Sequence, residues 1–193
     1  MTTAPALPRI SQWVAALEER KGRLTDPQRA AELDLLIEHL TAEDQRDLPR
    51  TLATVSLRGA YHSWGGSRAY TATVPEQADI YREVLDRSEH TFHLALEMER
   101  FFSGPDGICL DGYLHKQTTA DEVIAMGHAV PPGADPGELL VLTRRMALFV
   151  SFVDGLMAGE DMYRDDHGTV TTATEWAAAR PHLTGSGAGV DAG

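Results

Sequence analysis

Apolar residues at helical spacing dominate the first part of the chain. An amphipathic helix is predicted over residues 10–24, and its apolar face comprises Trp13, Ala16, Leu17 and Leu24. The following TDPQ stretch combines a capping residue, Thr25, with a first-turn proline and a capping-box glutamine, which predicts a second helix over 26–41. The TAED stretch repeats this capping pattern and predicts a third helix over 42–53, which Pro49 divides into shorter turns.

After residue 53 the pattern becomes that of strands joined by turns. The predicted elements are a mixed strand over 55–64, a helix over 74–88, an alternating strand over 92–102, its hairpin partner over 108–118, a helical turn over 120–126, a long strand over 138–152 and a last strand over 156–163. GPDG and Asp154-Gly155 are the turns of the two hairpins. In FHLALEMERFF, one face is predicted to carry Phe92, Leu94, Leu96, Met98 and Phe102, and the other face includes Phe101.

This order of elements predicts one α+β domain over residues 10–165, with helices segregated to one face of a curved antiparallel sheet. Such a sheet, closed by helices, forms a cone with an interior cavity. Residues 1–9 are predicted to be a flexible N-terminal tail, and residues 166–193 a Gly/Ala-rich tail that is partly disordered, with a short helix near 173–179.

The amino-acid composition limits the kinds of molecule that the protein is expected to bind. The 193-residue chain has a formal net charge of −12 and no basic run, which argues against nucleic acid and anionic lipid. Cys109 is the only cysteine, so an intrachain disulfide and a cysteine-based zinc framework are excluded. The first residues lack a signal-peptide pattern, and Arg144 and Arg145 interrupt the longest apolar run. A cytoplasmic protein is therefore expected.

Three stretches carry a family resemblance: RDLPRTLATVSLRGAYHSWG (46–65), the helix from about 75, and DGLMAGEDMYRD (154–165). Together with the element order across 26–165, they resemble the nuclear transport factor 2-like superfamily and, within it, the SnoaL-like polyketide cyclase group. Ketosteroid isomerase and limonene-epoxide hydrolase are relatives there. The resemblance implies a cone-shaped curved antiparallel or mixed sheet with three or four helices enclosing a cavity, to which the helix at 10–24 is an N-terminal addition.

The resemblance also implies positions for a site. His62 stands where the isomerase has its general base, and His39 lies near the place of its oxyanion-binding tyrosine. Arg144 matches the arginine of an Arg-x-Asp pair in the epoxide hydrolase, but Met146 replaces the aspartate, which argues against that mechanism. Asp161 falls where the hydrolase and the cyclases hold a catalytic carboxylate.

Strand alternation gives a separate expectation about these side chains. If His62 points inward, Ala60 and Trp64 also point inward, whereas Tyr61 and Ser63 point outward. Arg144 would share a face with Leu142, Met146 and Leu148. An arginine among apolar residues needs an anionic partner, and Asp161 is the nearest candidate in sequence.

The predicted catalytic residues are therefore His62 as general base or acid, Asp161 as its orienting or proton-handling partner, and Arg144 as the group that holds the carboxylate or an enolate-like oxygen. The predicted substrate-binding residues are Trp64, Met146, His39 and Tyr163. The alternative is a purely structural role, in which Arg144 and Asp161 form an ion pair and His62 is a hydrogen-bonded polar residue at the mouth of a pocket.

The remaining histidines and one tyrosine have less specific patterns. His39 lies beside an apolar helix stripe and also fits a histidine at the edge of the core. His90 and His93 lie on opposite strand faces without a third ligand, so no metal site is predicted. Tyr113 and His115 share one face of their strand, which is either the cavity wall or the outer face of the sheet.

These inferences point to a SnoaL-like small-molecule enzyme that needs no metal or organic cofactor. It would use general acid–base chemistry on a hydrophobic oxygenated substrate, such as a polyketide or terpenoid, in a cyclisation, an isomerisation or a related rearrangement. Two alternatives remain open: a non-catalytic protein that binds a small ligand in the same cavity, and a protein-interaction module. A homodimer through the outer face of the sheet is expected from the resemblance.

Overall fold

The computed structural model describes residues 11–65, 69–85, 94–135 and 138–183. Its elements are α1 (Ser11–Lys21), α2 (Pro27–Asp44), α3 (Leu48–Ala53), β1 (Ala60–Trp64), β2 (Tyr70–Thr73), α4 (Val74–Leu85), β3 (Leu94–Gly104), β4 (Gly107–Thr118), α5 (Ala120–Ala125), β5 (Leu140–Val153), β6 (Leu156–Arg164), β7 (Thr169–Thr172) and α6 (Ala173–Ala179). None of the helices in these ranges is long and apolar enough to cross a membrane.

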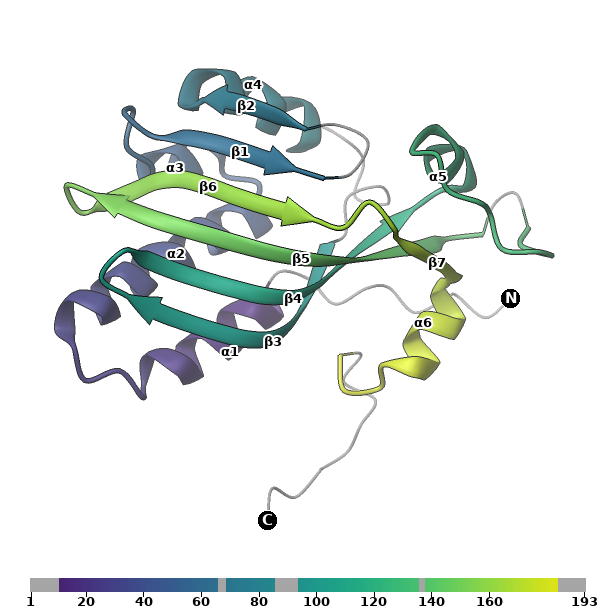
Figure 1. The fold of residues 1–193 in the computed structure, drawn as a ribbon, viewed down its shortest axis with the longest axis horizontal. Helices are drawn as coiled ribbons and strands as arrows, with labels where there is room; N and C mark the ends of the chain where they lie inside the picture. The colour runs from purple at the N-terminus through teal and green to yellow at the C-terminus, as the bar shows by residue number, and fades with distance from the viewer. Residues whose placement is uncertain (1–10, 66–68, 86–93, 136–137, 184–193) are drawn as a thin grey trace, which may run out of the picture.

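The strands form one curved sheet in the order β2-β1-β6-β5-β4-β3, and β7 pairs with β5 beyond the end of β6. The pair β1–β6 is parallel, whereas the other named pairs are antiparallel. Helices α1, α2 and α3 lie together on one face of this sheet (Figure 1). The predicted α+β class and the mixed curved sheet are confirmed.

A hydrophobic core fills the space between these helices and the concave face of the sheet. Side chains that are at most 2% exposed come from α2 and from alternate positions of the central strands, and include Leu33, Leu36, Leu40, Ile108, Leu110, Met146, Leu148 and Val150. Helix α1 adds Trp13 and Leu17, which are 8% and 1% exposed. The predicted N-terminal helix is therefore an integral layer of the core.

The helix boundaries differ from the sequence prediction because other residues form the caps. Asp26, not Thr25, caps α2. The helix then continues through Thr41, whose hydroxyl donates a hydrogen bond of 2.7 Å to the carbonyl of Ile37 one turn earlier instead of starting a new helix. Asp47 caps the short helix α3. The prediction of a helix start at Thr41 was therefore wrong.

A β-bulge in β3 interrupts the alternation of inward and outward side chains that was predicted for that strand. The register shifts between Met98 and Arg100, so Glu99 is an extra residue opposite β4. An extra residue reverses which side chains point to the core beyond it. Phe101 accordingly packs against the core, whereas Phe102 is 56% exposed, the opposite of the predicted orientation.

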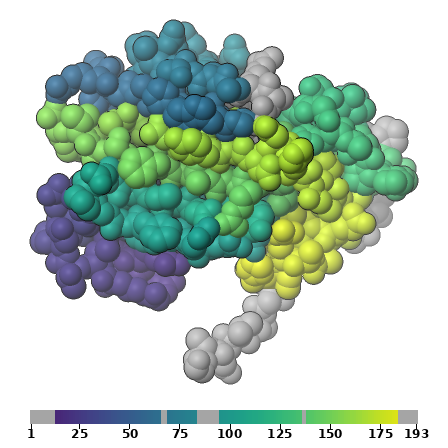
Figure 2. All heavy atoms as spheres, in the orientation of Figure 1, coloured from purple at the N-terminus to yellow at the C-terminus, as the bar shows by residue number. Residues whose placement is uncertain are grey.

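Strand β1 is shorter than the predicted strand over 55–64, and the sequence analysis missed β2. Residues 169–179, which it assigned to the C-terminal tail, form β7 and α6, and the helix predicted near 173–179 is confirmed. Trp176 of α6 is 2% exposed, and its Nε1 donates a hydrogen bond of 3.0 Å to Nδ1 of His115 on the outer face of β4. Helix α6 thus covers one end of the outer sheet face (Figure 2).

Candidate functional site

A cavity of about 1000 Å³ opens on the concave side of the sheet, where β2, α4 and the ends of β4, β5 and β6 converge. Its apolar wall includes Ala72, Ile80, Leu114, Met126 and Leu142. Tyr70, Arg144 and Arg164 bring polar groups to the same space, and acidic residues of α4 line the opposite rim. An apolar cavity with a few converging polar groups is the usual form of a small-molecule site, so this cavity is the candidate functional site.

Two arginines on adjacent strands define the polar side of the cavity. Arg164 of β6 pairs with Met146 of β5, and Arg144 lies two residues before Met146 on the same face. Arg144 is 7% exposed, and its Nη2 donates a hydrogen bond of 2.7 Å to Nε2 of His128. Nη2 of Arg164 donates a hydrogen bond of 2.6 Å to the hydroxyl of Ser63. Burial lowers the pKa of both guanidinium groups, and the charge of Arg164 lowers that of Arg144 further.

The surroundings of Arg144 hold it in place without a carboxylate in direct contact. Because Nε2 of His128 accepts a hydrogen bond from Arg144, that imidazole is neutral, and burial and the arginine charge lower its pKa. Gly168 lies against Arg144 and Leu142, where a Cβ would overlap the leucine side chain. The charges of Asp165 and Asp166 attract Arg144 and raise its pKa, against the effect of burial.

A second polar cluster lies deeper in the cone, beneath α2. His39 is fully buried, and its Nε2 lies 3.6 Å from the carboxylate of Glu43 and 3.7 Å from that of Glu160. Burial raises the pKa of Glu160, the charge of His39 opposes this shift and the charge of Glu43 adds to it, and together they bring the pKa to about 7. Tyr61 and Tyr81 pack edge to face over this cluster, with ring centroids 6.1 Å apart.

The hydrogen bonds of His39 assign a proton to Nδ1. The hydroxyl of Thr54 donates to the carbonyl of Thr51, so it accepts from Nδ1 of His39 at 2.7 Å. Among the described residues Nε2 has no hydrogen-bond partner, and it faces the carboxylates of Glu43 and Glu160. Burial lowers the pKa of His39, but Glu43 and Glu160 outweigh burial and leave it raised. His39 was predicted to bind substrate, but it does not line the cavity.

The structure places His62 on the outer face of the sheet, so the expectation that it points inward was wrong. Tyr61 and Ser63 are the inward residues of β1, at 2% and 3% exposed. The imidazole of His62 stacks on Trp64 at 5.1 Å between ring centroids and lies 4.0 Å from the carboxylate of Asp161.

The other predicted residues divide between the two faces. Tyr163 stacks on Trp64 at 4.5 Å between ring centroids, so four predicted residues gather on the outer face. Arg144 and Met146 point inward as expected, but Arg144 lies on the opposite face from Asp161 and forms no ion pair with it. The predicted trio of His62, Asp161 and Arg144 is therefore not assembled in one place.

The reason for this error is that alternation in AYHSW is ambiguous. Aromatic side chains occupy both faces of β1, so the pattern does not show which face is buried. The same one-residue shift applies to β6, where Glu160 rather than Asp161 is the inward carboxylate. The sequence analysis also missed Arg164, although its spacing of two residues from Met162 places it on the face of that partly buried methionine. Tyr113 and His115, left undecided, lie on the outer face under Arg145 and α6.

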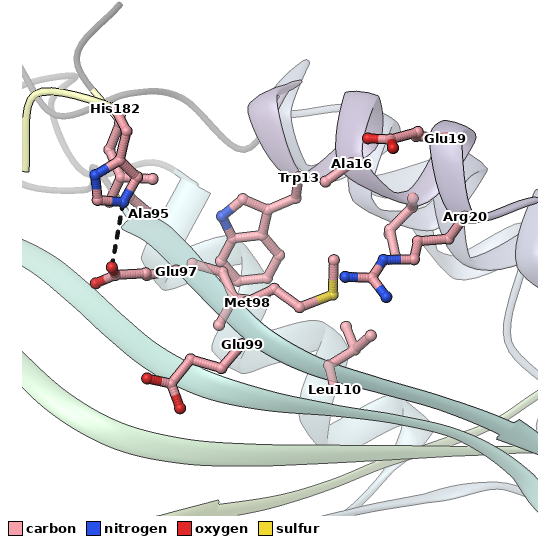
Figure 3. A pocket seen from close by; sticks show the side chains of 13 residues that line it. Trp13, Ala16, Glu19, Arg20, Ala95, Glu97, Met98, Glu99, Leu110 and His182 are labelled. Carbon is pink, nitrogen blue, oxygen red and sulfur yellow. Dashed lines mark hydrogen bonds and ion pairs between the residues drawn. The ribbon is translucent and has the colours of Figure 1, made fainter. Parts of the chain in front are cut away.

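A second hollow, of about 390 Å³, lies between α1 and β3 on the far side of the core from the arginine pair. Figure 3 shows Trp13 and Arg20 of α1 facing Met98 and Leu110, with Glu97 bound to His182 at one end. Nε1 of Trp13 is buried without a hydrogen-bond partner. This hollow is smaller, and its acidic residues Glu97 and Glu99 are engaged by arginines.

Among the described residues, no group of three or more histidine, cysteine, aspartate or glutamate side chains could hold a metal ion. His90 and His93 lie outside those residues.

No protein-family model and no curated protein matches the chain. Solved structures do. A protein assigned to the SnoaL-like polyketide cyclases, from Shewanella putrefaciens CN-32, superposes with a TM-score of 0.55 at 12% identity, covering 86% of this chain and 92% of that chain. A nuclear transport factor 2-like protein from Burkholderia xenovorans LB400 gives 0.52 at 9% identity, covering 70% and 90%. The chain therefore has the nuclear transport factor 2-like fold, as the resemblance implied.

Proposed function

We propose that the chain binds a hydrophobic, oxygen-containing small molecule in the concave cavity. The observation that carries this proposal is the cavity itself, in which the apolar wall around Leu114 and Leu142 faces the polar groups of Tyr70 and the two arginines. The apolar wall favours burial of a hydrocarbon body, and the polar groups orient the ligand.

The neutral fluorescent probe N-phenyl-1-naphthylamine tests this proposal. Leu114→Trp places a larger side chain in the cavity, whereas Tyr113→Trp changes the neighbouring residue on the outer face of the same strand. The probe is expected to bind the wild type and Tyr113→Trp alike and to bind Leu114→Trp about tenfold more weakly, a loss of about 1.4 kcal/mol. Absence of binding to the wild type, or equal binding to both variants, would refute the proposal.

A catalytic function is a second candidate, and the buried pair of His39 and Glu160 favours it. A carboxyl group whose pKa lies near neutrality suits proton transfer. The pair lies deeper than the cavity, since Glu160 is four residues, about 13 Å along the strand, from Arg164. A substrate held at the arginines would therefore have to extend to this pair, which would then move a proton next to one of its carbonyls without a cofactor.

The catalytic function predicts a different effect of substitutions than ligand binding alone. For any compound that displaces the probe and is turned over, Glu160→Gln is expected to lose turnover while the probe still binds. The catalytic role predicted for His62 and Asp161 from the sequence stays a prediction. If His62→Ala and Asp161→Ala abolish turnover and Glu160→Gln does not, the chemistry belongs to the outer face instead.

A further inference from the structure

Of the other partly buried arginines that the structure describes, Arg20 lies over the ring of Phe101, and the rest differ from the arginines of the cavity. Arg29, Arg50, Arg145 and Arg180 each form an ion pair with a carboxylate. Neither Arg144 nor Arg164 has a carboxylate within 4.0 Å among the residues that the structure describes. Their hydrogen-bond partners, His128 and Ser63, are neutral.

A shortage of acidic residues does not explain this difference. The chain has 29 aspartates and glutamates against 17 lysines and arginines. The acids that line the same cavity belong to α4, where Glu76 accepts hydrogen bonds from Thr73, Asp79 pairs with Arg82, and Glu83 is exposed. Lys116 lines the cavity too, and it pairs with Glu122. Among the described residues of the cavity wall, the two arginines are thus the cationic groups without a carboxylate in contact.

The unused hydrogen-bond donors point the same way. The Nε atoms of Arg144 and Arg164 are both buried, and neither has a hydrogen-bond partner within the described part of the chain. A buried charge without a counterion is costly, and an unsatisfied donor adds to that cost. The two residues are diagonal neighbours on adjacent strands, a separation of about 7–8 Å between their positions, which guanidinium groups bridge easily when they bind one anion.

We infer that the ligand of this cavity carries an anionic oxygen group, such as a carboxylate, which the guanidinium groups of Arg144 and Arg164 bind. The apolar body of the ligand then lies against Leu114 and Leu142. This inference rests on the proposed function, because it names the chemical class of ligand for the same cavity. It also gives Arg164, which the sequence analysis did not select, the role of a specificity-determining residue.

Two probes with the same apolar body separate the inference from the proposed function. 8-Anilinonaphthalene-1-sulfonate is the sulfonated form of N-phenyl-1-naphthylamine. The wild type is expected to bind the sulfonate at least tenfold more tightly than the neutral amine. Arg144→Gln and Arg164→Gln are each expected to weaken binding of the sulfonate about tenfold and that of the neutral amine less than threefold, because each variant removes one charge-assisted hydrogen bond to the sulfonate.

Arg145→Gln is the matched control. It removes the same charge from the same strand, but Arg145 lies on the outer face and pairs with Asp111 and Glu99. Its binding of the sulfonate should equal that of the wild type. Equal losses in Arg145→Gln and Arg164→Gln would overturn the inference, since they would show a general charge effect.

A measurement on the unmodified protein avoids dependence on folding of the variants. Sodium decanoate is expected to displace bound N-phenyl-1-naphthylamine at lower concentration than 1-decanol does. If the neutral amine binds but neither the sulfonate nor decanoate is preferred, the inference falls and the proposed function stands. If neither fluorescent probe binds, both fall.

Discussion

Replacing Glu160 with glutamine is expected to stabilise the protein at pH 8 and to change its stability by less than about 1 kcal/mol at pH 5. The side chain of Glu160 is only 12% exposed beside His39 and Glu43, and burial is the main cause that raises its pKa from 4.5 to about 7. The folded protein therefore holds this proton more tightly than the unfolded chain. The stability that results is complete below pH 4.5 and is lost as the pH rises through 7.

The expected size follows from the same two pKa values. At 1.36 kcal/mol per pH unit, a change from 4.5 to about 7 corresponds to about 3 kcal/mol between acid and alkaline conditions. Glutamine stays neutral at both values, so Glu160→Gln avoids this loss. For a chain of this length, about 3 kcal/mol corresponds to a difference in melting temperature of about 6–12 °C at pH 8.

The comparison of wild type and variant also removes another pH effect. Burial lowers the pKa of His115 to about 4, so the folded state resists protonating it. Its contribution to stability therefore falls as the pH drops from 6.5 towards 4, opposite in sign to that of Glu160. Because His115 is present in both proteins, its contribution cancels in their difference.

The assay is urea denaturation of wild type and Glu160→Gln at pH 5, 6, 7 and 8. Asp161→Asn is the control, since Asp161 is the next residue on the strand and is about one-third exposed on the outer face. A partly exposed charge contributes less than about 1 kcal/mol, so this variant should differ little from wild type. If the difference between Glu160→Gln and wild type does not change with pH, the assignment of a raised pKa to Glu160 is refuted.

Three further predictions concern the fold and assembly. Gly159→Ala should prevent stable folding, because Gly159 has a φ of 100° and a Cβ would overlap the backbone of Ala60, whereas Gly104→Ala, with open space around it, should melt like wild type in a thermal scan. Trp176→Phe removes the donor that anchors α6 and should lower the free energy of unfolding by about 1–3 kcal/mol in urea titrations. Tyr163 is 50% exposed on the outer face, so Tyr163→Glu should dissociate the predicted homodimer in light-scattering measurements; a wild type that is monomeric at all concentrations would contradict that prediction.

Much of the fold could be predicted because periodicity and turn chemistry are local. The apolar stripe of α1, the GPDG hairpin and the long strand β5 all lie where the pattern indicates. The errors arise where one residue decides the outcome. Glu99 as a bulge residue reverses Phe101 and Phe102, and no local pattern distinguishes a bulge from a continuous strand.

The site was harder to predict because a shift of one residue exchanges the two faces of a strand. His62 and Asp161 were correctly expected to be neighbours, and the parallel pairing of β1 with β6 places them opposite each other. Their face depends on tertiary packing of Tyr61 against Tyr81, which the sequence does not show. Arg164 was missed because an arginine at the end of a strand usually reaches solvent.

A crystal structure of the protein soaked with 8-anilinonaphthalene-1-sulfonate tests the central claim most directly. The account predicts the naphthalene ring against Leu114 and Leu142 in the concave cavity, with the sulfonate oxygens within hydrogen-bond distance of Arg144 and Arg164. It would be contradicted if the concave cavity stayed empty and the probe lay on the outer face, stacked on Trp64.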